Sequence, residues 1–270
     1  MTSLFRFRRH RFAVPVLLLV GLILAGTVYA AVLPSAGASD RGPNDFTAEQ
    51  VELGRELFLA NCATCHGLDA EGGTTDGDGK VAGPSLIGVG AASVDFQVGT
   101  GRMPLQASGP QAPKRAPQFS EEQTRALAAY VASLAPGPGI PDDEWLDASQ
   151  GDVAVGGEIF RTNCAMCHNF FGNGGALTEG KYAPAINSEP VHTYEAMVTG
   201  PQNMPVFSDE VLTPEEKRDV IAFLEYAQSE PTPGGLSLGA IGPVSEGLIA
   251  WIVGIGGLVA LAVWLGARAS

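Results

Sequence analysis

Two copies of one short pattern constrain this chain of 270 residues more than any other feature. The pattern Cys-x-x-Cys-His occurs at residues 62–66 and 164–168, and the two copies contain all four cysteines of the chain. Two thiols three residues apart lie about one helical turn apart, so each can form a thioether with a haem vinyl group. The adjoining histidine then lies beneath the iron as an axial ligand. The pattern predicts two covalently bound haem c groups, with thioethers at Cys62, Cys65, Cys164 and Cys167 and axial histidines at His66 and His168.

Other uses of paired cysteines fit these motifs less well. Two disulfides are possible in an exported protein, but they do not require a histidine after each pair. Zinc sites made from two Cys-x-x-Cys pairs usually separate the pairs by about 15–20 residues. Here the pairs are separated by about 100 residues. A thioredoxin-like redox pair needs a βαβ setting, which this sequence does not indicate.

The sequence around the two motifs repeats at a constant offset of 102 residues. Each half also ends in a predicted helix that starts with a capping box, from Ser120 to Leu134 and from Thr213 to Gln228. The repeat predicts an all-α fold of two tandem domains, residues 46–135 and 151–230, joined by a linker at 136–150. The repeated positions are Gly54 and Gly156, Glu56 and Glu158, Phe58 and Phe160, and Asn61 and Asn163.

The glycines of the opening helices predict close helix crossings, because a missing side chain lets another helix approach. The closing helix of each half carries an aromatic residue that can lie at such a crossing. The expected contacts are Tyr130 with Gly54 and Phe58, and Phe223 with Gly156 and Phe160.

A second axial ligand is predicted for each haem iron. Met103 lies 37 residues after His66, Met204 lies 36 residues after His168, and each methionine precedes a proline. A thioether ligand raises the haem reduction potential, as in cytochromes c. The repetition predicts Met103 as the ligand of the first haem iron and Met204 as the ligand of the second.

The remaining histidines leave one alternative open. His10 lies in the basic N-terminal segment, and His192, which we expect in a loop, could replace Met204. Pro84 and Pro184 follow the haem histidines by 18 and 16 residues. A backbone carbonyl near each proline is expected to accept the other ring N–H of the histidine and fix its orientation.

The first 33 residues form an export or anchoring segment. Four arginines precede an apolar run from Phe12 to Leu33. The run exceeds the 7–15 residues of a usual signal peptide and approaches the roughly 20 that cross a bilayer. Residues 28–30 and 36–38 resemble cleavage sites, so a signal peptide and a retained transmembrane anchor both stay open.

The C-terminal run 247–267 contains no charge in 21 residues and has Trp251 and Trp264 near its ends. It predicts a transmembrane helix, reached through a Pro- and Gly-rich stalk at 231–246. The positive-inside rule places the N-terminal arginines and Arg268 in the cytoplasm. The haem domains are therefore expected on the outer side of the cell membrane.

The exported region is strongly acidic. It contains 11 Lys and Arg against 29 Asp and Glu, a net charge of −18. This balance argues against nucleic acid as a partner, because phosphate binding needs clustered Lys and Arg. Attraction to a basic redox partner is the functional interpretation, and simple solvation is the alternative.

Both halves resemble class I cytochrome c domains. The Gly-x-x-x-Phe helix, Cys-x-x-Cys-His, the Gly-Pro-type loop, Met-Pro and the closing helix match over Phe46 to Leu134 and Asp152 to Gln228. Together with the two hydrophobic ends, they resemble the dihaem cytochrome c subunit of actinobacterial menaquinol–cytochrome c reductases (cytochrome bc complexes). The long Gln106 to Gln118 stretch departs from this pattern, and the sequence gives it no role.

The resemblance implies an electron-transfer subunit of a translocating oxidoreductase complex in the respiratory chain, not a catalyst on its own. Its implied partners are a Rieske iron–sulfur protein, a cytochrome b subunit and a cytochrome c oxidase. Electrons would pass from the Rieske cluster to the first haem, then to the second, then to the oxidase. Two alternatives are a dihaem subunit of a terminal oxidase or another reductase, and a dihaem peroxidase, which needs an open sixth position on one iron.

Overall fold

The computed structural model describes residues 13–32, 43–74, 81–107, 109–229 and 243–269. The chain divides into two units, residues 1–42 and 43–270. In the first unit, α2 (Ala13–Val32) is a 20-residue apolar helix. The N-terminal arginines, the motif at 36–38 and residues 231–242 of the predicted stalk lie outside the described residues.

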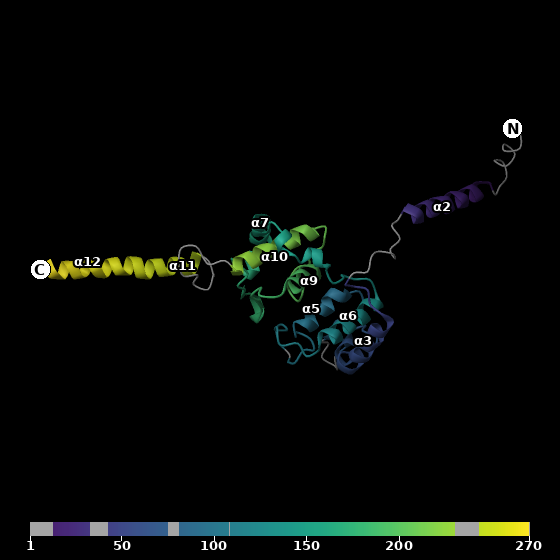
Figure 1. Ribbon diagram of the computed structural model, residues 1–270, viewed down its shortest axis with the longest axis horizontal. Coiled ribbons are helices and arrows are strands. Elements are labelled where there is room, and N and C mark those ends of the chain that lie inside the picture. The colour runs from purple at the N-terminus through teal and green to yellow at the C-terminus, as the bar shows by residue number, and fades with distance from the viewer. Residues whose placement is uncertain (1–12, 33–42, 75–80, 108, 230–242, 270) are drawn as a thin grey trace, which may run out of the picture. The chain divides into compact units, whose positions relative to one another are not determined.

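The two halves of the second unit repeat the same order of elements (Figure 1). The first half contains α3 (Ala48–Asn61), α4 (Ala63–His66), β1 (Gly73–Thr74), β2 (Val81–Gly83), α5 (Gly90–Gly99) and α6 (Glu121–Leu134). The second half contains η1 (Asp143–Trp145), η2 (Ala148–Gln150), α7 (Val153–Asn163), α8 (Ala165–His168), β3 (Gly175–Ala176), η3 (Thr178–Gly180), β4 (Tyr182–Ala183), α9 (Pro190–Thr199) and α10 (Pro214–Ser229).

The fold is mostly helical, but the expectation of a purely α fold is wrong in one detail. In each half, residues after the cysteine motif form a short antiparallel pair, β1 with β2 and β3 with β4. These strands are two or three residues long, too short to leave a period-two hydrophobic pattern in the sequence. They pack against the motif helices α4 and α8.

Capping side chains start the main helices where the sequence predicts. Ser120 accepts a hydrogen bond from the backbone N–H of Gln123, whose side chain accepts one from Ser120 in return. Thr213 and Glu216 exchange the same two bonds at the start of α10. Thr47 caps α3 in the same way, and Asp152 caps α7. The two predicted capping boxes are confirmed.

The predicted helix crossings are also confirmed. In the first half, α3 packs across α6 and the rings of Phe58 and Tyr130 lie 5.2 Å apart between centroids. In the second half, α7 packs across α10 and the rings of Phe160 and Phe223 lie 5.3 Å apart. Each crossing forms the centre of its own buried hydrophobic core.

The predicted linker 136–150 is an ordered part of the fold. The Pro138 carbonyl accepts a hydrogen bond from the Ala92 N–H at 3.1 Å. Asn44 exchanges two hydrogen bonds with the backbone of Ile140, at 2.8 and 2.9 Å. At the other end, Trp145 packs against the core of the second half, and Arg218 lies over its ring at 5.6 Å. The segment therefore ties the two halves together.

The 106–118 stretch, which the sequence leaves without a role, lies against the second half. Gln111 exchanges hydrogen bonds with the backbone of Tyr182, at 2.7 and 3.0 Å. Gln202 does the same with the backbone of Ala112, at 3.0 and 3.1 Å. Helices α5 and α9 also pack together. We call the 106–118 segment the strap, because it fastens the first half to the second.

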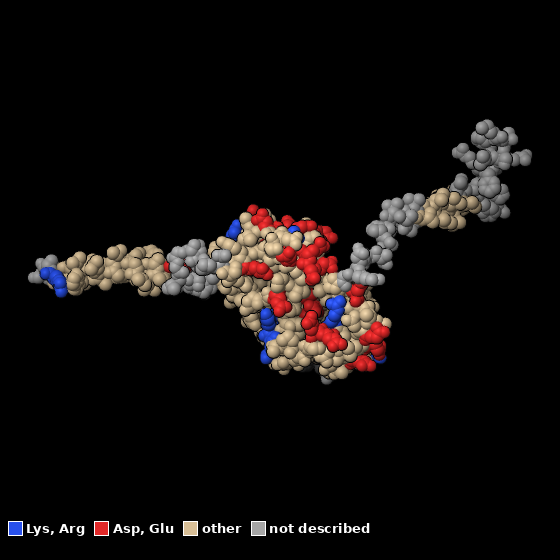
Figure 2. Space-filling model, in the orientation of Figure 1, with Lys and Arg blue, Asp and Glu red and all other residues tan. Residues whose placement is uncertain are grey.

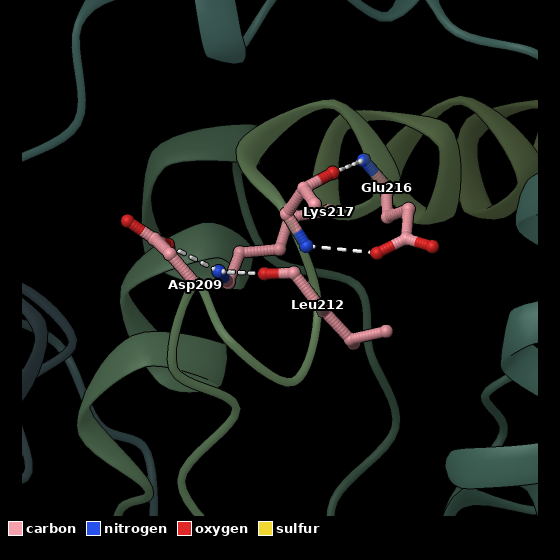
Figure 3. Close-up of polar contacts among 5 residues, drawn as sticks. Asp209, Leu212, Glu216 and Lys217 are labelled. Carbon is pink, nitrogen blue, oxygen red and sulfur yellow. Dashed lines mark hydrogen bonds and ion pairs between the residues drawn. The ribbon is translucent and has the colours of Figure 1, made fainter.

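A buried lysine fixes the loop that follows Met204 (Figure 3). The Lys217 side chain is fully buried, and its Nζ lies 2.7 Å from the Asp209 carboxylate and 2.5 Å from the Leu212 carbonyl oxygen. The ring of Tyr194 lies 5.6 Å from the same nitrogen. A buried ammonium is stable only when its charge and donors are paired, so these contacts hold the loop on α10.

The C-terminal helix is the one described segment long and apolar enough to cross a membrane. Its parts are α11 (Pro243–Ile249), η5 (Ala250–Ile255), which is π-helical, and α12 (Gly256–Ala269). The helix therefore extends beyond the predicted span at both ends. The apolar span of 24 residues is about 36 Å long, enough for the roughly 30 Å hydrocarbon core of a bilayer. Near its end, Arg268 lies 4.3 Å from the Trp264 ring.

Candidate haem sites

The two cysteine motifs have the same backbone geometry. The Cys62 N–H donates to the Phe58 carbonyl at 2.8 Å, and the His66 N–H donates to the Cys62 carbonyl at 3.0 Å. In the second motif, the corresponding bonds of Cys164 and His168 both measure 2.9 Å. Each motif therefore continues from the opening helix as one further helical turn, which presents both thiols and the histidine together.

A backbone carbonyl orients each histidine, as predicted. Nδ1 of His66 lies 2.7 Å from the Pro84 carbonyl oxygen, and Nδ1 of His168 lies 3.0 Å from that of Pro184. A carbonyl can only accept, so Nδ1 carries the proton and Nε2 keeps its lone pair for a metal. Gly83 makes room for the first ring, because a Cβ there would lie 2.9 Å from His66 Nδ1.

The four thiols are unpaired, so the structure contains no disulfide between them. Burial raises the pKa of Cys62 to about 11, and it does the same for Cys164. Both groups are therefore neutral thiols at physiological pH.

Both predicted methionine ligands pack against the same cores as the motifs. Met103 and Cys62 contact the core around Phe58, and Met204 and Cys164 contact the core around Phe160. The chain thus brings each methionine back to the half in which its motif lies.

The donor set of each half fits haem c. It combines two thiols, an imidazole with a free Nε2 and a soft thioether. Apolar side chains beside the motifs also lie exposed, with 70% of Leu68 and 93% of Met166 accessible. A hollow of about 350 Å³ lies elsewhere, lined by residues such as Phe46, Val51 and Ala129, and it contains none of the predicted ligands.

His192, which the sequence places in a loop, lies in helix α9, so that expectation is wrong. Its ring faces the first half, with Nε2 3.8 Å from Asp95 Oδ2 of α5 and an edge contact to Phe96. Pro190 starts α9 at its first turn, which explains why the segment is helical. These contacts give His192 a position between the two halves.

Sequence reasoning missed the two carboxylates beside His192. Glu195 is fully buried, and Asp95 lies on the facing helix α5. The available signal was an acidic residue inside each of two short apolar segments, 90–99 and 190–199. Burial and the neighbouring Asp95 raise the pKa of Glu195 to about 10, so the pair shares a proton at neutral pH.

This shared proton predicts a pH-dependent stability. The unfolded chain loses the Glu195 proton near pH 4.5 and the folded chain keeps it until about pH 10, so stability should fall across this range. The slope is at most about 1.4 kcal/mol per pH unit. Glu195→Gln should remove it, as measured by denaturant unfolding of the detergent-solubilised full chain at pH 5.5–8.5 with a chelator present. An equal slope in wild type and variant would contradict the shared proton.

The charged groups that act on this pair and on His192 come from four parts of the fold. His192 of α9 and Glu121 and Arg125 of α6 act on Asp95. Glu189 just before α9, Lys114 of the strap and Arg102 act on His192. Each is unchanged in Glu195→Gln, so the comparison isolates the proton of the pair.

Two protein-family models match the chain. Residues 51–135 match the model for cytochrome c, and residues 151–224 match the model for subunit III of cbb3-type cytochrome c oxidase. A cbb3-type cytochrome c oxidase subunit of Rhizobium leguminosarum is 33% identical over 119 residues, covering 43% of this chain and 38% of that protein. A solved structure, the Kuenenia stuttgartiensis reducing HAO-like protein complex, matches with 16% identity and a TM-score of 0.33, covering 70% of this chain and 99% of that one. A match at this level gives no information about function.

Relatives along nearly the whole chain share one description. The cytochrome bc1 complex cytochrome c subunit of Corynebacterium efficiens is 44% identical over 268 residues, which cover 93% of this chain and 87% of that protein. The subunit of the same name from Mycobacterium tuberculosis is 42% identical, covering 96% of this chain and 92% of that protein. Two cytochrome c domains and a C-terminal apolar helix agree with that description. This chain therefore belongs to the family of cytochrome bc1 complex cytochrome c subunits, electron-transfer proteins of the respiratory chain.

Proposed function

We propose that this chain is a membrane-anchored dihaem electron carrier within a menaquinol–cytochrome c reductase. It accepts electrons from a Rieske iron–sulfur protein and passes them to a cytochrome c oxidase, without a separate soluble cytochrome. One observation carries this proposal: the complete donor set for a haem occurs twice, in two halves that are fastened to each other within one chain.

Corresponding residues in the two halves would hold the two haems in the same way. Cys62 and Cys65 would anchor the first haem, and the contact of His66 Nδ1 with Pro84 leaves Nε2 available as an iron ligand. Cys164 and Cys167 would anchor the second haem, where His168 has the same support from Pro184. When bound, haem supplies a reversible one-electron iron couple. Met103 and Met204 would supply the second ligand of each iron, which would raise both potentials and keep small molecules off the iron.

The contacts between the two halves support transfer inside one chain. The strap, the 136–150 segment and the packing of α5 against α9 keep the halves in a fixed arrangement. A fixed arrangement holds the distance between two redox centres constant, so no diffusional encounter is needed. The membrane helix would keep the pair next to its partners, with the C-terminus in the cytoplasm and the haem domains outside.

The acidic surface of this chain supports the inference that its redox partners have basic docking surfaces. Figure 2 shows groups of acidic side chains among the other residues of the visible face, and far fewer basic ones. Complementary charges steer encounter and fix orientation more than they add affinity. Electron transfer to a separately added oxidase should therefore slow as ionic strength rises.

Purification in mild detergent tests the proposed setting. A tagged full chain should co-purify with a cytochrome b, a Rieske protein and an oxidase, and the preparation should oxidise menaquinol with oxygen. Co-purification with an oxidase but no cytochrome b or Rieske protein would contradict the reductase assignment and favour a terminal oxidase subunit. Rapid binding of carbon monoxide or hydrogen peroxide to the native haems would contradict methionine ligation and favour a peroxidase.

A further inference from the structure

Three side chains meet where the two halves of the chain pack together. Asp95 comes from α5 of the first half, and His192 and Glu195 come from α9 of the second. One ligand atom from each lies within 4.8 Å of the other two. His192 and Glu195 are three residues apart, so they share one face of the helix. The haem sites use none of these residues.

The hydrogen bonding of this cluster is incomplete. Glu195 is 0% exposed, and neither of its carboxylate oxygens has a hydrogen-bond donor among the residues that the structure describes. His192 Nε2 and Asp95 Oδ2 lie 3.8 Å apart, which is too long for a hydrogen bond. A proton shared between the two carboxylates satisfies one contact, but it leaves the imidazole nitrogen unengaged.

A divalent cation would engage all three groups at once. Zinc binds imidazole nitrogen and carboxylate oxygen at about 2.0–2.2 Å, so two ligands of a tetrahedral ion lie about 3.4 Å apart. The 3.8 Å separation of His192 and Asp95 needs to close by only a few tenths of an ångström. Two carboxylates carry two negative charges, which one divalent cation neutralises, and a water can take the fourth position.

A cation can reach the cluster from solvent, and there is space for it beside the ligand nitrogen. The side chains of His192 and Asp95 are 16% and 22% exposed, so the cluster has a path to solvent although Glu195 does not. Gly99 faces the imidazole, and a Cβ there would lie 3.0 Å from Nε2. Glycine at this position therefore keeps the space beside the nitrogen open.

We propose that Asp95, His192 and Glu195 form a binding site for a divalent transition-metal ion, with zinc the best fit, that clips the two haem domains together. The ligands come from both halves, so the bound ion favours the packed arrangement over any separated one. The site is structural and does not take part in electron transfer. It complements the strap, which fastens the same two halves through hydrogen bonds between glutamine side chains and backbone groups.

Zinc titration of the haem-loaded full chain in detergent tests this proposal. The chain is treated with a chelator, dialysed and carries no histidine tag, and complete haem loading removes the cysteines as competing ligands. Isothermal calorimetry should find one zinc ion per chain. The thermal midpoint should rise by about 5 °C or more when zinc exceeds its Kd a hundredfold.

Matched variants locate the site. Asp95→Asn in the first half and Glu195→Gln in the second should each weaken zinc binding at least about tenfold. Glu158→Gln, at an exposed residue of α7 away from the cluster, should leave it unchanged. The haem absorption spectrum and circular dichroism show that each variant is folded. If one of the two site variants fails to fold, the other carries the comparison.

X-ray absorption at the zinc edge gives an independent readout. It should show only nitrogen and oxygen ligands near 2.0–2.2 Å. A sulfur shell near 2.3 Å would overturn the proposal, because it would place the ion on unloaded cysteines. Absence of zinc binding at micromolar concentration, or equal affinity in wild type and both site variants, would overturn it as well.

Discussion

Gly156→Ala should destabilise the second haem domain by about 3 kcal/mol or more, while Gly157→Ala next to it should have little effect. A Cβ at Gly156 would overlap the backbone carbonyl of Asp219 where α7 crosses α10, and it would lie 2.9 Å from the Val220 nitrogen. Backbone of a packed helix cannot move aside, so the crossing has to open, and overpacking of this kind commonly costs 1–3 kcal/mol or more. The roughly 1 kcal/mol that alanine gains over glycine in a helix does not offset this cost.

Gly157 is a matched control because it is also buried in the same helix. A Cβ there would meet the Phe223 ring at 3.0 Å and an Arg161 side-chain nitrogen at 3.2 Å, and both side chains can shift. Thermal unfolding of the two variants, followed by circular dichroism and by the haem absorption band, measures the difference. Similar melting temperatures for Gly156→Ala and Gly157→Ala would contradict the close crossing. Gly54→Ala should act on the first domain in the same way, because its Cβ would overlap the Ala126 carbonyl.

Met204→Ala should lower the reduction potential of one haem and open that iron to carbon monoxide. A methionine thioether stabilises the reduced iron, and axial ligands together span roughly 0.8 V of haem potential. We therefore expect a fall that is a substantial fraction of this range, with the other haem unchanged. Potentiometric titration followed in the visible spectrum measures both haems in the same sample.

Met197→Leu provides the control for this experiment. Met197 is a buried methionine of the same half, 3% exposed, and it belongs to the core around Phe160. Its replacement by leucine preserves volume and should leave both potentials unchanged. An unchanged potential in Met204→Ala would show that Met204 is not the sixth ligand. Met103→Ala should produce the corresponding fall at the first haem.

The close crossings could be predicted because they depend on a local pattern repeated at one offset. The orientation of the histidines could be predicted because a proline follows each motif at a similar distance, 18 and 16 residues after the histidine. Gly54 and Phe58 recur as Gly156 and Phe160. A glycine on a helix face allows another helix to approach closely, because it has no side chain. Capping boxes at Ser120 and Thr213 are equally local, because their hydrogen bonds span three residues. The short strands could not be predicted, since two-residue pairings leave no periodic signal.

The position of His192 could not be predicted from the residues around it in the sequence. The sequence leaves it as a loop residue or a spare iron ligand, whereas the structure places it on a helix, 3.8 Å from a carboxylate of the other half. The 106–118 strap is a similar case, because Gln111 and Ala112 find their partners 71 and 90 residues further along the chain. Contacts at such separations depend on how two finished domains pack, and side-chain patterns within either domain do not encode that packing.

The predicted haem attachment therefore depends on local sequence alone. Covalent attachment of haem depends on two thiols and a histidine within five residues, and such short spacing fixes their relative geometry once a helical turn forms. The tertiary structure alone shows that a strap and an ordered linker fasten the two halves, and that a His–Asp–Glu cluster lies between them. Those contacts join residues that are far apart in the chain, so only the folded arrangement brings them together.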